Sequence, residues 1–172
     1  MKILLAVASK HGTTAELATW IASRLEEQGF EVMQAKAQDV TSLAGIDAII
    51  LGSAVYLTKW MDGAYRFIKT FEAELRRIPT FAFSVGLSRT KSGGVQDPSR
   101  VGPVLLTIEP IKYKTFKGAL DPAKLNLRER TIAKLGGAYE GDFREHDEVN
   151  AWTDEIVAYL RNHETETGQN TE

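Results

Sequence analysis

Two short runs of exclusively apolar residues narrow the folds open to this chain more than any other feature. Residues 3–8 form the first run, and residues 48–51 form the second. Neither run alternates apolar with polar residues, as a strand with one solvated face does. A strand that is apolar on both faces needs helices above and below it, which is the arrangement of a parallel sheet in an α/β protein. The two runs therefore predict a parallel sheet with helices on both faces.

The remaining pattern supplies further strands and the helices between them. Apolar positions recur at helical spacing from Ala15 and stop at Gly29, a residue that suits the position after a helix. A similar pattern over residues 101–108 contains Pro103, so the pattern does not decide whether a helix forms there. The other predicted helices are 62–76, 125–135 and 146–162, and the predicted strands are 3–8, 30–36, 47–52, 80–85 and 115–120. We expect one doubly wound α/β domain over residues 1–163, a three-layer sandwich around a five-stranded parallel sheet, and a polar, disordered tail over 164–172.

Composition excludes several classes of protein. The 172 residues include no cysteine, which rules out disulfides, thiolate metal sites and cysteine nucleophiles and makes the cytoplasm the expected compartment. The net charge of -2 argues against a nucleic-acid binder. The longest apolar run is far shorter than a membrane span, and His11, His146 and His163 are too far apart to indicate a metal site. We expect a folded, metal-free protein without a nucleic-acid partner.

The segment after the first strand, residues 9–14, is suited to binding an anion. It has the sequence Ser-Lys-His-Gly-Thr-Thr and precedes a helix, where free amides and the helix dipole favour negative charge. Hydroxyls of Ser9, Thr13 and Thr14 can donate to a phosphate, Gly12 allows close approach of the backbone, and Lys10 or His11 can add positive charge. The alternative is a capped helix start with solvated side chains. The chain contains neither G-x-G-x-x-G nor G-x-x-x-x-G-K-[ST], so NAD and ATP are not the expected ligands.

Residues 9–14 resemble the T/S-x-T-G-x-T phosphate loop of flavodoxins, with His11 in place of the usual hydroxyl. Within that superfamily the chain is most similar to the flavodoxin-domain family of menaquinone-dependent protoporphyrinogen oxidase, over almost all residues up to about Leu160. The stretches that carry this resemblance are residues 52–56, 83–87 and 137–143.

The resemblance implies the flavodoxin fold, with strand order 2-1-3-4-5 and one FMN across the ends of the first, third and fourth strands. Residues 9–14 would hold its phosphate. Tyr56 and Trp60 are the aromatic candidates for a wall against the flavin ring, although aromatic side chains beside a strand end are often part of the core. The residues expected to frame the ring are Ser53, Ala54, Val55, Tyr56 and Trp60 on one side and Ser84, Val85, Gly86 and Leu87 on the other.

Basic residues concentrate in 57–100 and 112–134, whereas residues 135–172 are strongly acidic. A basic rim favours an anionic substrate, such as a porphyrin with carboxylate side chains. It also favours peripheral contact with the acidic surface at the inner face of a membrane. The alternative is that these cations only solvate helices. The helix predicted at residues 125–135 is less hydrophobic than its counterpart in the protoporphyrinogen oxidases, which weakens the case for membrane contact.

Three functions are compatible with the sequence. The first is an FMN-dependent oxidoreductase that passes electrons from a reduced substrate, such as protoporphyrinogen IX in heme biosynthesis, to a quinone or another acceptor. The second is a flavodoxin-type electron carrier with a protein partner and no substrate of its own. The third is a binding module that has lost the cofactor. In the first two the flavin itself does the redox chemistry, and the sequence indicates no protein acid or base.

Overall fold

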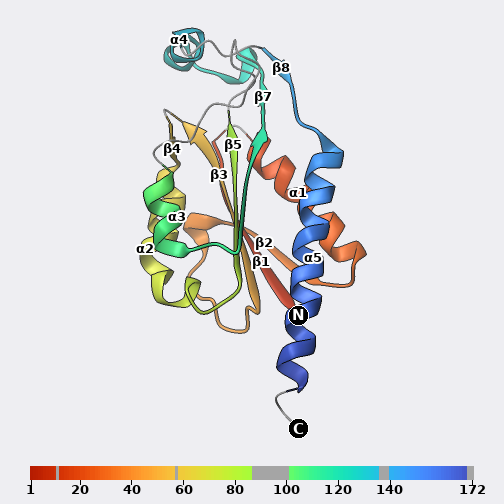
Figure 1. Ribbon diagram of the computed structural model, residues 1–172. Helices are drawn as coiled ribbons and strands as arrows, with labels where there is room; N and C mark the ends of the chain where they lie inside the picture. Colours follow the sequence, from red (N-terminus) through yellow and green to blue (C-terminus); the bar gives the residue numbers. More distant parts are fainter. Residues whose placement is uncertain (11, 57, 87–100, 136–139, 170–172) are drawn as a thin grey trace.

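The computed structural model describes residues 1–10, 12–56, 58–86, 101–135 and 140–169. Its main sheet contains five parallel strands in the order β2-β1-β3-β5-β6 (Figure 1). A two-residue strand, β4 (Lys59–Trp60), pairs antiparallel with β3. Because β5 and β6 are the fourth and fifth long strands, the predicted order 2-1-3-4-5 is confirmed. The long strands are β1 (Lys2–Ala8), β2 (Glu31–Lys36), β3 (Ala48–Tyr56), β5 (Thr80–Gly86) and β6 (Lys112–Lys117).

Helices cover both faces of this sheet. Helices α1 (Thr13–Glu27) and α5 (His146–Gln169) lie on one face, and α2 (Asp62–Leu75) and α3 (Gly102–Ile108) lie on the other (Figure 1). Alternate residues of β1 belong to two different cores: Ile3, Leu5 and Val7 pack with α1 and α5, and Leu4, Ala6 and Ala8 pack with α2 and α3. Burial of both faces explains why this strand is apolar throughout. The predicted three-layer α/β fold is confirmed.

Local signals set several helix ends. Gly12 and Gly29, which flank α1, have φ angles of +91° and +87°, which glycine adopts without strain. Pro103 lies in the first turn of α3, where its missing N–H would have no helical partner, so this proline does not prevent the helix. Helix α5 continues to Gln169, so its predicted end at Asn162 is too early and the helix extends into the segment predicted as a tail.

The predicted strand over residues 115–120 is wrong at both ends. Strand β6 begins at Lys112 and ends at Lys117, and Ala119–Leu120 form a separate strand, β7, that pairs antiparallel with β8 (Gly141–Asp142). The break falls at Gly118, where a Cβ atom would lie 2.5 Å from the carbonyl oxygen of Gly86. Only glycine fits there, and the chain leaves the sheet at this point.

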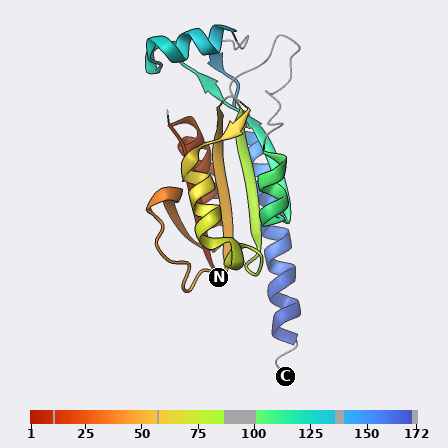
Figure 2. The same cartoon turned by 90° about the vertical axis from the view of Figure 1, so that its left-hand side faces the viewer.

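The segment that leaves the sheet forms a small lobe beyond the carboxyl ends of the strands (Figure 2). We call β7, the short 3-10 helix η2 (Pro122–Lys124), α4 (Leu127–Leu135) and β8 the cap lobe. Asn126 Oδ1 accepts from the Glu129 amide, and Glu129 Oε2 accepts from the Asn126 amide, both at 2.9 Å. This reciprocal pair is a capping box, which explains where α4 begins. Within the described ranges, no helix is both long and apolar enough to cross a membrane.

Candidate functional site

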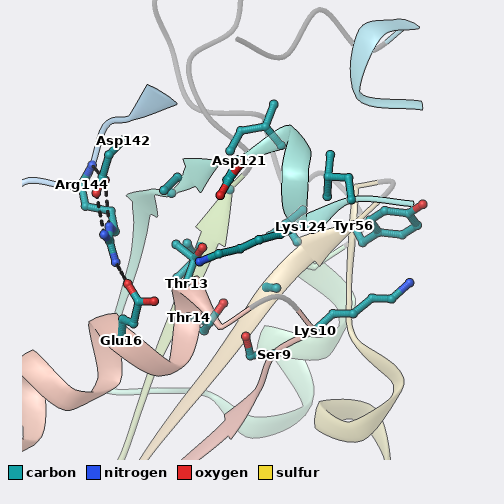
Figure 3. Close-up of a pocket in the computed structure, with 18 of the residues that line it drawn as sticks. Ser9, Lys10, Thr13, Thr14, Glu16, Tyr56, Asp121, Lys124, Asp142 and Arg144 are labelled. Atoms are coloured by element: carbon teal, nitrogen blue, oxygen red, sulfur yellow. Dashed lines mark hydrogen bonds and ion pairs between the residues drawn. The ribbon is translucent and has the colours of Figure 1, made fainter. Parts of the chain in front are cut away.

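A cavity of about 350 Å³ lies between the carboxyl ends of β1, β3 and β5 and the cap lobe (Figure 3). Strand register explains why these segments meet, because Ala8 pairs with Ser53 and Ser53 pairs with Ser84 across three neighbouring strands. The residues that follow these three positions therefore emerge together. The described lining residues are Ser9, Lys10, Thr13, Thr14, Glu16, Ala54, Val55, Tyr56, Met61, Val85, Gly86, Gly118, Ala119, Leu120, Asp121, Lys124, Leu125, Glu140, Gly141, Asp142 and Arg144.

The start of α1 forms the floor of the cavity. Gly12 occupies the N-cap position, so no side chain there can accept from the first amides of the helix. Ser9 Oγ accepts from the Gly12 amide at 3.3 Å, and Ser9 and Thr13 both line the cavity. Helix amides, the helix dipole and two hydroxyls together form a site suited to a phosphate.

Lys10 lies at the edge of this floor, but its ammonium group contacts the cap lobe. Its ammonium donates to the carboxylate of Glu129 in α4, whose side chain is only 5% exposed. That hydrogen bond raises the pKa of Lys10 above its usual range. The ammonium also lies 5.8 Å from the centre of the Tyr56 ring and points away from Thr13 (Figure 3). Lys10 thus joins the phosphate loop to the cap lobe, and its charge is not directed at the floor of the cavity.

The two aromatic candidates for the wall occupy different places. Tyr56, the last residue of β3, lines the cavity. Trp60 does not line it, because its side chain is 1% exposed and belongs to the core under α2. The Trp60 indole donates to Ser84 Oγ at 2.7 Å, and Ser84 Oγ lies 2.7 Å from the Tyr113 hydroxyl. Of the two, only Tyr56 is positioned as a wall, while Trp60 holds the end of β5 from beneath.

Arg144 pairs with two carboxylates on the side of the cavity formed by α1 and β8. Its guanidinium donates to Asp142, with Nε 2.8 Å from Oδ1, and to Glu16. The hydrogen bond from Arg144 lowers the pKa of Asp142, and these contacts raise the pKa of Arg144. The guanidinium also lies 5.1 Å from the centre of the Trp20 ring. Arg144 thereby attaches the cap lobe to α1 and offsets part of the negative charge of that wall.

The structure brings most of the predicted site residues together. Gly12 is the N-cap of α1, the helix whose start forms the floor. Ser53 is buried with its Oγ accepting from the Met61 amide at 3.0 Å, and Ser84 is buried with Trp60. His11 and Leu87 lie outside the described residues. The predicted residues that line the cavity are Ser9, Lys10, Thr13, Thr14, Ala54, Val55, Tyr56, Val85 and Gly86.

Sequence reasoning did not identify the contribution of the cap lobe to the cavity. Lys124 of the lobe lines the cavity, as do Gly118 and Arg144, which flank the lobe. Gly118 lies in the predicted strand 115–120, and Lys124 and Arg144 lie in the connections on either side of the predicted helix 125–135. Two signals were present, namely the basic character of residues 112–134 and the resemblance over residues 137–143. Neither signal shows that the chain folds back over the strand ends. In the described ranges, no group of acidic or histidine side chains is arranged to hold a metal ion.

Comparison with known proteins identifies the family. Residues 4–146 match the flavodoxin domain. The chain belongs to the flavodoxin domain family. No curated protein sequence matches it.

Solved flavodoxins share the fold at low sequence identity. A mutant flavodoxin from Pseudomonas aeruginosa is 16% identical, with a TM-score of 0.56 and coverage of 94% of this chain and 99% of that one. Oxidised Flavodoxin 1 from Bacillus cereus is also 16% identical, with a TM-score of 0.56 over 92% and 98% of the two chains. Rubredoxin oxygen:oxidoreductase from Desulfovibrio gigas is 12% identical, with a TM-score of 0.64 over 94% of this chain and 36% of that one.

FMN is the cofactor of this flavodoxin-domain protein, as the resemblance of residues 9–14 to the flavodoxin phosphate loop implies. The described residues fit it, because the uncapped start of α1 with Ser9 and Thr13 suits the phosphate. Tyr56 and the ends of β3 and β5 supply an aromatic side chain and backbone groups beside the space for the ring.

Proposed function

We propose that this protein is an FMN-dependent oxidoreductase that takes electrons from a reduced, anionic small molecule and delivers them to a quinone or another acceptor. The observation that carries the proposal is the charge of the cap lobe beside the cavity. Arg128 and Lys134 are exposed there, and neither has a side-chain hydrogen bond or ion pair within the described ranges. Uncompensated cations at the mouth of a site raise the local concentration of an anionic substrate.

Each part of the site has a role in this proposal. FMN supplies reversible transfer of two electrons together with a proton. The start of α1 and the hydroxyls of Ser9 and Thr13 bind the phosphate, and Tyr56 excludes water from one side of the ring. The hydrogen bonds among Trp60, Ser84 and Tyr113 fix the strand ends that position the ring. The residues hold and orient the cofactor, and the cations of the cap lobe attract the substrate.

Protoporphyrinogen IX is the substrate that the family resemblance favours, because it is reduced and carries carboxylates. The test is oxidation of protoporphyrinogen by the FMN-loaded protein under anaerobic conditions, with menadione as acceptor and porphyrin fluorescence as the readout. Controls without protein and with free FMN at the same concentration measure the background. A rate above both controls supports the proposal, and a rate equal to them rules out this substrate.

A charge variant separates attraction of the substrate from chemistry. Arg128→Glu combined with Lys134→Glu reverses two exposed charges that do not line the cavity. We expect a higher KM for the porphyrinogen and an unchanged kcat, because these residues act before the substrate is bound. An unchanged KM would leave the cap lobe without a role in substrate attraction.

A quinone acceptor and these cations would also suit a protein that works in the cytoplasm at the inner face of the membrane.

The second candidate function is that of an electron carrier that serves a protein partner. Leu127 favours it, because this residue of the cap lobe is 83% exposed. A partner that docks on the lobe would cover this apolar side chain. Absence of turnover with small molecules, combined with rapid reduction by a flavodoxin reductase, is the result expected of a carrier.

A further inference from the structure

We propose that Lys124 of the cap lobe binds the phosphate of FMN, a role that rests on the proposed flavin function. Lys124 belongs to η2, more than a hundred residues along the chain from the phosphate loop. Its side chain extends across the cavity toward Thr13 at the start of α1 (Figure 3). The amine is therefore directed at the place where the helix dipole and the hydroxyls favour an anion.

The other cations in the lining are already bound. Lys10 donates to Glu129, and Arg144 donates to Asp142 and Glu16. Within the described part of the chain, Lys124 has neither an ion pair nor a side-chain hydrogen bond. Of the three described cations in the wall, Lys124 is thus the one whose charge remains available to a ligand.

The acidic side chains near Lys124 do not cancel the attraction of its charge for an anion. Glu16 and Asp142 face Arg144, and Asp121 accepts from the Ala123 amide at 2.9 Å. Glu140 also lines the cavity, but it is exposed, so solvent screens its charge.

An anion between Thr13 and Lys124 would therefore meet helix amides below and an ammonium above. Such a contact also holds the cap lobe against the flavin site. Cofactor binding is in this way linked to the position of the lobe.

The test compares FMN with riboflavin, which has the same ring and ribityl chain without the phosphate. Kd values for both are measured by quenching of flavin fluorescence, in wild type, Lys124→Met, Lys124→Arg and Lys69→Met. We expect Lys124→Met to weaken FMN binding about tenfold and to leave riboflavin binding unchanged, because one charge-assisted hydrogen bond is lost. Lys124→Arg should retain most of the FMN affinity. Lys69→Met removes an exposed lysine of α2 that does not line the cavity, and it should match wild type.

Salt dependence gives a second readout. FMN affinity of wild type should fall as ionic strength rises, and this fall should be smaller in Lys124→Met, because fewer cations contact the phosphate. An unchanged FMN Kd in Lys124→Met, or equal weakening of FMN and riboflavin, would overturn the role of Lys124 while leaving the flavin function intact. Wild type that binds neither flavin would overturn the proposed function and this inference together.

Discussion

Gly52 in the middle of β3 shows how closely the sheet packs against its own side chains. A Cβ atom there would lie 2.2 Å from Cζ of Phe83. Phe83 is fully buried and makes edge contacts with Phe116 and Trp152, with ring centres 5.9 Å away in each case. The ring has no space into which it can move, so the site excludes even a methyl group.

We predict that Gly52→Ala lowers the free energy of unfolding by about 1–3 kcal/mol, the usual cost of overpacking a core. Urea denaturation followed by circular dichroism measures it. Gly102→Ala is the matched control, because a Cβ atom at Gly102 would meet nothing within 4 Å. That control should be neutral or slightly stabilising. Equal stability of both variants would contradict the packing argument.

Asp142 makes part of the stability dependent on pH. Arg144 lowers the pKa of this carboxyl in the folded protein, so the ion pair stabilises the fold above the ordinary pKa of Asp and is lost as pH falls through the lower, folded value. Asp142→Asn should therefore lose less stability than wild type between pH 5 and pH 3. This interval brackets the pKa of an unperturbed Asp, which is about 3.9.

Chemical denaturation at a series of pH values tests the role of Asp142. Asp39→Asn is the control, because the Asp39 carboxylate has no ion pair within the described ranges. That variant should follow the wild-type profile. A profile of Asp142→Asn that matches wild type would show that the contact with Arg144 does not contribute to acid stability.

Among the secondary structure elements, β6 and α5 share a row of ion pairs along the open edge of the sheet. Lys112 pairs with Glu155 at 2.7 Å, Lys114 pairs with Glu148 at 2.8 Å, and Lys117 pairs with Glu145, the residue immediately before α5. Exposed pairs of this kind contribute little to stability, about 0–1 kcal/mol each. Lysines on an edge strand have a second effect, because they oppose pairing with another chain.

We predict that Lys112→Thr combined with Lys114→Thr promotes self-association without unfolding the protein. Light scattering after size-exclusion chromatography measures it, and circular dichroism checks the fold. Glu148→Gln with Glu155→Gln breaks the same ion pairs but keeps both lysines on the strand, so this control should stay dispersed. Association of the control to the same extent would mean that the pairs, and not the strand charges, protect the edge.

The cap lobe depends on the contact between Lys10 and Glu129. Glu129 is almost fully buried and also completes the capping box of α4, so loss of Lys10 removes a cation from a desolvated carboxylate. Lys10→Met should therefore speed hydrogen exchange of the α4 amides by about tenfold and leave β1 and β3 unchanged. Unchanged exchange in α4 would show that the contact does not hold the lobe.

Particular elements show what the sequence could and could not predict. Strands β1 and β3 are buried on both faces over most of their length and were predicted from their apolar runs, whereas the start of edge strand β6 was not predicted because it carries lysines. The phosphate loop was predicted because its residues are contiguous. Lys124 and Arg144 reach the cavity only because the chain breaks at Gly118 and returns through β8, which is a tertiary event without a local pattern. Tyr56 and Trp60 were indistinguishable because both are aromatic and close to one strand end.

For the whole molecule, the cavity is built from segments distributed along most of the chain. The start of α1, the ends of β3 and β5, and the cap lobe each contribute one wall, and Lys10 and Arg144 connect two of these walls through ion pairs. The sheet itself is held by two large cores that do not involve the cap lobe. The free energy of ligand binding should therefore appear as stability of the whole fold, with its local effects concentrated in the lobe and the loops.

Thermal unfolding with FMN tests this coupling. At a free FMN concentration one hundred times Kd, binding to the folded state alone adds about 2.7 kcal/mol of stability. For a domain of this size, that should raise Tm by about 5–10 °C. Thr13→Ala removes a hydroxyl from the floor of the cavity, so a higher FMN concentration should be needed for the same rise in Tm. The Tm without FMN should stay almost unchanged, because Thr13 belongs to neither core. A Tm that does not respond to FMN would contradict cofactor binding by the folded chain, and an equal response in Thr13→Ala would place the phosphate away from the start of α1.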